Sequence, residues 1–169
     1  MLTSHELLGF MSPSLANEIL NFAYESDKPT YKATLNAVAD ARKIRAVFLE
    51  RQARAQRHAM MTSTLARPAL ETAAGGLLRA WLVKQQRPML VDFLNALEIK
   101  NENGVVDDLP KTVDDAKLKS AIETLLGKYP AEVVAVYLNA FNDMNLAGWA
   151  NLKTMLESDA RLQLGGHAG

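Results

Sequence analysis

One stretch decides the fold that this sequence predicts: residues 30–65, TYKATLNAVADARKIRAVFLERQARAQRHAMMTSTL. It follows Pro29, which suits the first turn of a helix because the N–H that proline lacks is not needed there. No Pro or Gly then occurs before Pro68, and the stretch is rich in Ala, Leu, Arg, Gln and Met, which favour helices. The stretch therefore predicts one long central helix over about residues 29–65.

Two stripes at spacings of three and four run along this predicted helix. The first is apolar nearly throughout and is expected in the core: Ala37, Ala41, Ile44, Phe48, Ala55 and Ala59. The second begins apolar and becomes polar halfway, which places long polar side chains beside the packed seam. Such side chains either lay their stems on apolar surface or form a surface on which a partner docks. The candidate interaction residues are Arg42, Arg45, Gln52, Gln56, Arg54 and Arg57, with Arg54 and Arg57 expected on the outer face.

Helix signals continue on both sides of this stretch. Ser12-Pro13 places a capping hydroxyl before a proline, and Gly127 follows a periodic apolar run, as at the end of a helix. Residues 130–142 keep helical spacing, although their β-branched content leaves a strand as the alternative. We therefore expect an all-α bundle of about seven or eight helices around the long central helix, in a single domain of residues 1–169.

Residues 98–111 are the one clearly non-helical region. Asn103-Gly104 is a signal for a type I′ turn, so either a small hairpin or a plain loop is expected there.

Two acidic pairs, Asp107-Asp108 and Asp114-Asp115, lie in or just after this region. Paired carboxylates can hold Mg²⁺ or Ca²⁺, but the calcium-loop pattern fails at its first and last ligand positions. Negative charge in the first turn of a helix is a sufficient structural role for the second pair. We expect neither a metal nor a cofactor.

The net charge of zero hides an asymmetry between the two halves of the chain. Residues 1–91 carry twelve Lys/Arg and seven Asp/Glu, whereas residues 92–169 carry seven Lys/Arg and twelve Asp/Glu. The positive excess is densest in residues 42–67, where Glu50 is the only acidic residue. Such asymmetry can steer an acidic partner or nucleic acid, let the two halves attract each other, or make two copies pack head to tail.

No constellation of catalytic residues is visible in the sequence, which disfavours an enzyme. Because the chain has no cysteine, thiolate catalysis and disulfides are excluded. The three histidines, His5, His58 and His167, stand far apart, and each is expected on the surface. The N-terminus lacks the pattern of a secretory signal, and the longest apolar run, residues 133–138, is too short to span a bilayer. We therefore expect a cytoplasmic protein that does not act at a membrane.

These observations predict a non-enzymatic helical interaction or scaffold protein that binds itself or another protein. The first alternative is nucleic-acid binding through a basic set, although no aromatic side chains are interleaved with it for base stacking. That set is Arg42, Lys43, Arg45, Arg51, Arg54, Arg57 and Arg67. The second alternative is a ligand binder or enzyme with a pocket between helices that uses Trp81, Tyr137 or Trp149.

Overall fold

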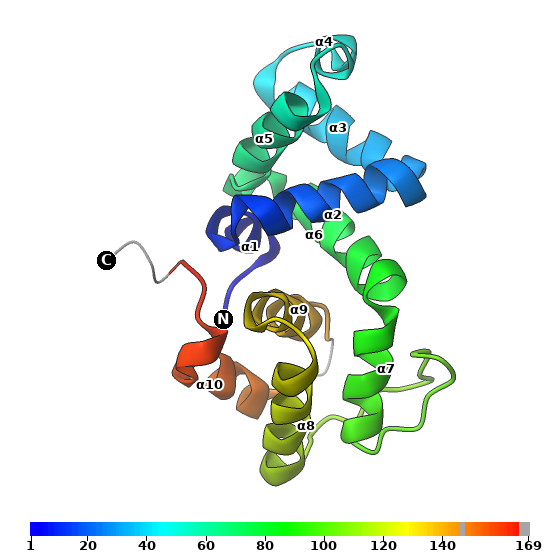
Figure 1. The fold of residues 1–169 in the computed structure, drawn as a ribbon, viewed down its shortest axis with the longest axis vertical. Helices are drawn as coiled ribbons and strands as arrows, with labels where there is room; N and C mark the ends of the chain where they lie inside the picture. The colour runs from blue at the N-terminus through cyan, green and yellow to red at the C-terminus, as the bar shows by residue number, and fades with distance from the viewer. Residues whose placement is uncertain (146–147, 166–169) are drawn as a thin grey trace. The chain divides into compact units, whose positions relative to one another are not determined.

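The computed structural model describes residues 1–145 and 148–165, and over this range the protein is all-α, which confirms the predicted fold class (Figure 1). Ten α-helices are described there, somewhat more than the seven or eight expected. They are α1 (Ser4–Phe10), α2 (Pro13–Ser26), α3 (Lys28–Arg42), α4 (Ala46–Glu50), α5 (Arg54–Leu65), α6 (Glu71–Ala80), α7 (Arg87–Ala96), α8 (Asp115–Lys128), α9 (Ala131–Met144) and α10 (Ala150–Ser158). Short helical turns add η1 (Pro68–Leu70), the π-helical η2 (Trp81–Gln85) and η3 (Ala160–Leu162).

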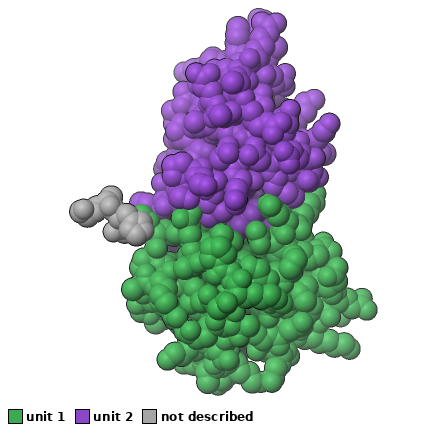
Figure 2. Space-filling view, viewed as in Figure 1, with its two compact units in different colours: residues 1, 82–169 green, residues 2–81 purple. Residues whose placement is uncertain are grey.

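The chain divides into two compact units, which Figure 2 shows in purple and green. The N-terminal unit is Leu2–Trp81 and holds α1 to α6, whereas the C-terminal unit is Leu82–Gly169 with Met1 and holds α7 to α10. The division falls inside η2, upstream of residue 91, where the sequence changes from basic to acidic. The N-terminal unit has ten Lys/Arg and seven Asp/Glu, and the C-terminal unit nine and twelve, so the two units carry opposite net charges.

The predicted long central helix is wrong, because the chain leaves the helical conformation twice within residues 29–65. α3 ends just before Lys43, whose backbone is left-handed (φ 57°, ψ 40°). The N–H groups of Lys43 and Ile44 donate to the carbonyl oxygens of Asp40 and Ala39, at 3.1 and 3.0 Å. This is the Schellman arrangement, in which glycine usually holds the left-handed position. After a second break, α5 packs against α2 and α3.

Neither break has a capping signal in the sequence. The residues before α4 and α5 are Arg45 and Ala53, and neither side chain accepts a hydrogen bond from the helix that follows. Helix propensities of the residues in this stretch differ by less than about 1 kcal/mol each. Packing of α5 against two neighbouring helices outweighs such differences, so the chain folds back on itself.

The core of the N-terminal unit lies between α1, α2, α3, α5 and α6. Each of these helices contributes fully or almost fully buried apolar side chains, among them Leu7, Ile19, Leu35, Met61 and Leu77. α1 approaches α6 closely, since a Cβ atom on Gly75 would lie 3.5 Å from Ser4 Oγ. Glu71 of α6 accepts hydrogen bonds from the backbone N–H groups of Ser4 and His5, at 3.0 and 2.9 Å. A carboxylate of one helix thus satisfies the first turn of another.

The C-terminal unit is built around α9, in which every residue from 134 to 142 is buried. The helix favoured for this segment is therefore confirmed and the strand is excluded. Phe141 of α9 packs edge-on against Phe93 of α7, with ring centroids 5.3 Å apart, and its centroid lies 5.5 Å from that of Trp149. The Trp149 indole also donates a hydrogen bond to the carbonyl oxygen of Pro110, at 2.7 Å, which ties the long loop to this core.

The region between α7 and α8 contains the predicted two-residue turn. Asn103 and Gly104 have φ values of 52° and 88°, both positive as a type I′ turn requires. Glu102 and Val105 exchange two backbone hydrogen bonds, at 2.9 and 3.0 Å. Over the described residues of this region, that bridge is the whole of the pairing, so the segment is a loop with one closed turn.

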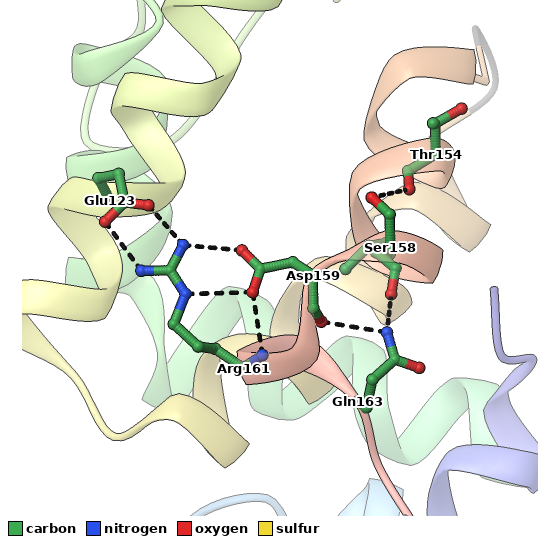
Figure 3. Close-up of polar contacts among 7 residues, drawn as sticks. Glu123, Thr154, Ser158, Asp159, Arg161 and Gln163 are labelled. Atoms are coloured by element: carbon green, nitrogen blue, oxygen red, sulfur yellow. Dashed lines mark hydrogen bonds and ion pairs between the residues drawn. The ribbon is translucent and has the colours of Figure 1, made fainter.

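A group of ion pairs fixes η3 to α8 (Figure 3). Arg161 donates from Nη1 to Glu123 Oε2 at 3.0 Å and from Nη2 to Asp159 Oδ2 at 2.8 Å. The hydrogen bonds from this guanidinium hold the pKa values of the Glu123 and Asp159 carboxyls below their usual ranges. Gln163 donates to the carbonyl oxygens of Leu156 and Asp159, at 2.7 and 3.1 Å. Since the Arg161 and Glu123 side chains are about half exposed, this ion pair orients η3 more than it stabilises the fold.

Replacing Lys43 tests the left-handed break. Within a continuous helix, glycine would lower the free energy of unfolding by about 1 kcal/mol relative to alanine. At a left-handed position, glycine is instead favoured by about 1 kcal/mol over a residue with a Cβ atom. We expect Lys43→Gly to be more stable than Lys43→Ala by that amount in urea unfolding. Both substitutions remove the same charge, so the reverse order would contradict the break.

Candidate functional site

The two helix breaks separate most of the six predicted interaction residues. Arg42 is half-buried and donates from Nε to Thr64 Oγ1 of α5, at 2.6 Å. Arg45 is exposed before α4, Gln52 is half-buried between α4 and α5, and Gln56 is exposed on α5. Arg42 therefore contributes to the packing of α3 against α5, whereas the other three residues lie before α4, between α4 and α5, and on α5.

Arg54 and Arg57 are the two that the structure brings together. The Arg54 guanidinium lies 4.0 Å from the centroid of the Tyr24 ring, and its Nη1 lies 3.3 Å from Glu25 Oε1. The expectation that Arg57 lies on the outer face is wrong, because α5 folds back on α3 and leaves this residue only 7% exposed. Its guanidinium carbon lies 5.5 Å from the Tyr24 ring centroid and 5.8 Å from that of Tyr31, so the charge faces two aromatic rings.

The same breaks expose apolar side chains that were expected in the core. Ile44, Val47 and Phe48 are all exposed, Phe48 by 54%, so the predicted burial of Ile44 and Phe48 is wrong. Ala55 and Ala59 are exposed as well. We call residues 43–51 the α4 tip; Figure 1 shows α4 at the outer end of α3 and α5.

The α4 tip is also basic. Lys43, Arg45 and Arg51 are exposed there, and Glu50 is its only acidic residue. Leu49 is fully buried and anchors the short helix to the unit. The tip therefore combines exposed apolar surface with positive charge, a combination that suits an acidic partner.

A cluster of polar side chains joins α2, α3 and α5, and we call Asn17, Tyr24, Tyr31, Arg57 and His58 the polar cluster. Tyr31, Arg57 and His58 are buried, Tyr24 is half-buried and Asn17 is exposed. Arg57 Nε donates to the Tyr31 hydroxyl at 2.8 Å, and that hydroxyl lies 2.8 Å from His58 Nε2. His58 Nδ1 lies 3.3 Å from Asn17 Oδ1. The Tyr24 and Tyr31 rings meet edge to face, with centroids 5.2 Å apart.

The donors fix the direction of every hydrogen bond in this cluster. A guanidinium can only donate, so the Tyr31 oxygen accepts from Arg57. The Asn17 amide oxygen beside His58 Nδ1 can only accept, and in a neutral ring this leaves Nε2 to accept the Tyr31 proton. His58 must then carry its proton on Nδ1, which donates to the carbonyl oxygen of the Asn17 amide. The chain of donors runs from Arg57 through Tyr31 and His58 to Asn17, and it requires a neutral imidazole.

Burial and charge both keep His58 neutral. Burial is the larger cause and the neighbouring Arg57 and Arg54 charges add to it, which lowers the pKa of His58 to about 4. Burial likewise raises the pKa of Tyr31. At neutral pH, Arg57 is therefore the one charged group of the polar cluster.

The three histidines were all expected on the surface. His58 is 1% exposed, so its predicted surface position is wrong. His5 is half-buried in α1, and its Nδ1 lies 2.5 Å from Glu71 Oε2. His167 lies outside the described residues.

Sequence reasoning missed Asn17, Tyr24, Tyr31 and His58 as members of a site. Tyr31 and Arg57 are 26 residues apart, and in a continuous helix they could not meet. No local pattern pairs them, because the pairing depends on the chain reversal between α3 and α5. The sequence did show polar residues intruding into an apolar stripe, but none of those polar residues belongs to the polar cluster.

The remaining predicted groups have structural roles. The Asp114 side chain caps α8 by accepting from the backbone N–H of Lys117 at 3.1 Å, and Asp115 accepts from Asn151 Nδ2 at 2.7 Å. No group of three or more metal-ligating side chains occurs among the residues that the structure describes. Trp81, Tyr137 and Trp149, the residues named for a pocket, are buried in the core.

Comparison with protein-family models, with curated protein sequences and with solved structures finds no match for this chain. Within residues 1–145 and 148–165, none of the helices has the length and apolar character needed to cross a membrane.

Tyr31→Phe tests the polar cluster. The substitution leaves Arg57 Nε and His58 Nε2 buried without their partner, so we expect the free energy of unfolding to fall by about 2–4 kcal/mol in urea titrations. Tyr24→Phe is the matched control, since its hydroxyl makes no hydrogen bond to a described residue. The control should stay within about 0.5 kcal/mol of the parent. Equal effects of the two substitutions would contradict the proposed donor chain.

The lowered pKa of His58 predicts a dependence of stability on pH. Between the unfolded value of 6.5 and the folded value of about 4, the unfolded chain binds a proton that the native cluster refuses, so stability falls as the pH drops through this window. We expect a loss of about 2 kcal/mol between pH 7 and pH 5. The measurement is urea unfolding in a His5→Gln, His167→Gln background, where His58 is the only histidine. A stability that is unchanged at pH 5 would refute the neutral buried imidazole.

Proposed function

We propose that this protein is a non-enzymatic helical protein that self-associates head to tail, with the α4 tip of one copy bound to an acidic segment of the next. The observation that carries the proposal is the exposure of Val47 and Phe48 on a helix of five residues and of Ile44 just before it. Apolar side chains grouped in this way gain free energy when a partner removes them from water.

Charge favours an acidic partner for this tip. Lys43, Arg45 and Arg51 surround the apolar side chains, and none of the three forms an ion pair with a described residue. An acidic surface brought against them would gain attraction and would be steered towards the tip before contact.

The same chain carries a surface of the complementary kind. Residues 102–115 hold exposed acidic side chains against a single Lys111: Glu102, Asp107, Asp108, Asp114 and Asp115. Val105, which lies among them beside the Asn103-Gly104 turn, is 64% exposed and offers an apolar contact. A second copy therefore supplies both the charge and the apolar surface that the α4 tip lacks.

An interface between two different surfaces of one chain leaves a free tip on one copy and a free acidic segment on the other. Such heterologous contacts close into rings or extend as filaments. The tip is small, so each contact is expected to be weak and reversible, and assembly should grow with protein concentration and weaken with salt.

Charge reversal with exchange of partners tests the proposal. An Arg45→Glu, Arg51→Glu variant and an Asp107→Lys, Asp108→Lys variant each place like charges on the two proposed surfaces, so each should be monomeric by light scattering. An equimolar mixture restores opposite charges at both contacts and should assemble. A monomeric parent chain at high concentration, or a mixture that stays monomeric, would refute the proposal.

Two serine variants separate the apolar contribution from the charge. Phe48→Ser should weaken parent assembly by about tenfold or more, because burial of a phenylalanine contributes about 1.5–3 kcal/mol. Phe10→Ser, which removes a similarly exposed phenylalanine from α1, should leave assembly unchanged. Co-purified nucleic acid, seen in the ultraviolet absorbance ratio and lost in the Arg45→Glu, Arg51→Glu variant, would instead support nucleic-acid binding by the tip.

A further inference from the structure

A hollow of about 640 Å³ opens beside Arg57 in the N-terminal unit. α2, α3, α4 and α5 line it, and Tyr24, Tyr31 and Leu35 provide its apolar surface. Its volume falls in the range of pockets that bind small organic molecules, about 300–1,000 Å³. Of the α4 tip, Glu50 lines the hollow, whereas Ile44, Val47 and Phe48, the apolar side chains of the proposed self-association contact, do not.

Arg57 reaches this hollow with hydrogen-bond donors to spare. Its guanidinium has five N–H groups, of which Nε donates to Tyr31 and Nη1 to the carbonyl oxygen of Glu50, at 2.8 and 3.0 Å. Nη2 makes no hydrogen bond to a described residue, yet it is not among the polar atoms that are sealed from solvent. Nη2 is therefore not fully sealed from solvent, and Arg57 lines the hollow.

The charge on Arg57 is also not neutralised nearby. No carboxylate oxygen of a described residue lies within 4.0 Å of its nitrogens. A buried charge without a counter-ion is costly, and neutral hydrogen bonds and ring faces offset only part of the cost. An anion bound at Nη2 would offset more of it, and the planar fork of a guanidinium suits carboxylate and phosphate oxygens.

Two lysines add positive charge to the rim of the same hollow. Lys28 and Lys32 are exposed and lie four residues apart on α3, so their side chains project from the same side of that helix. Neither forms an ion pair with a described carboxylate. Together with Arg57, they surround the hollow with three unpaired cations.

Two carboxylates line the hollow as well. Glu25 is already paired with Arg54, whose guanidinium covers one face of the Tyr24 ring. Glu50 is exposed, and its negative charge would repel a bound anion. With Arg54 counted, four cations face two carboxylates, so a net positive charge remains for a ligand.

We propose that this hollow binds a small organic oxyanion, whose carboxylate or phosphate group accepts from Arg57 Nη2 and from the ammonium groups of Lys28 and Lys32. The organic part of the ligand lies against Tyr24 and Leu35. A single phosphate ion would fill only a small part of the hollow, so a ligand with an apolar or aromatic body should bind more tightly than its inorganic anion.

The full chain is titrated with inorganic phosphate, adenosine monophosphate and succinate, at an ionic strength held constant with sodium chloride. We expect at least one of them to raise the midpoint of thermal unfolding by mass action and to shift the side-chain ¹⁵N resonances of Arg57. A response to phosphate or adenosine monophosphate indicates a phosphate ligand, whereas a response to succinate indicates a carboxylate ligand. Tighter binding of adenosine monophosphate than of phosphate would show that the organic part is held.

Three variants locate the effect. Arg57→Met should weaken binding by at least about tenfold, because a charge-assisted hydrogen bond contributes about 1.5–3 kcal/mol. Lys32→Gln changes an exposed side chain and should weaken ligand binding by about threefold to fivefold. Lys119→Gln on α8 removes an exposed lysine charge in the same way and should leave binding unchanged.

Repeating the titration in the Asp107→Lys, Asp108→Lys variant keeps the result independent of self-association. Absence of any shift at concentrations that would saturate a site with a Kd of about 1 mM would overturn the proposal. Equal weakening by Lys32→Gln and Lys119→Gln would also overturn it, since it would reduce the effect to general charge attraction.

Discussion

The left-handed backbone of Lys43 ends α3, and together with the second break it returns the chain along α2 and α3. Tyr31 and Arg57, separated by 26 residues, would stand about 39 Å apart in one continuous helix, yet they share a hydrogen bond of 2.8 Å. The polar cluster and the α4 tip of the N-terminal unit both follow from this reversal. The polar cluster forms where α5 meets α3, and the α4 tip forms where the chain turns.

The polar cluster shows which electrostatic effect decides its protonation. A proton on His58 would place a second positive charge in a buried position next to Arg57. Burial and repulsion between like charges both oppose this, so His58 remains neutral. The Arg57 guanidinium donates to Tyr31 and to the Glu50 carbonyl and faces two aromatic rings, and these contacts offset part of the cost of burying its charge. One permanent charge and one enforced neutral base therefore sit side by side.

Much of the secondary structure could be predicted from local signals. Ser12 caps α2, and Asn103-Gly104 adopts the backbone of a type I′ turn, because each depends on a few neighbouring residues. The break at Lys43 could not be predicted, since lysine favours a helix and nothing nearby marks a left-handed residue. Tertiary packing stabilises the break at Lys43, and packing between distant segments is not visible in the local sequence pattern.

The candidate site was predictable to a similar degree. Arg54 and Arg57 were singled out as basic residues of an outer face, and both guanidinium groups do lie near the Tyr24 ring, but Arg57 is buried there. Their partners Tyr31 and His58 were out of reach, because they are joined to Arg57 only after the chain has reversed. For the same reason Phe48, assigned to the core on its spacing, is exposed.

The polar cluster also limits how this chain can change over generations. Tyr31 accepts from Arg57 and donates to His58, so its loss would strand both neighbours at once. A lineage that replaces this tyrosine must replace the other two in nearly the same step, or pass through a poorly folded ancestor. Positions 31, 57 and 58 should therefore be inherited as a set, either all polar and mutually bonded or all apolar.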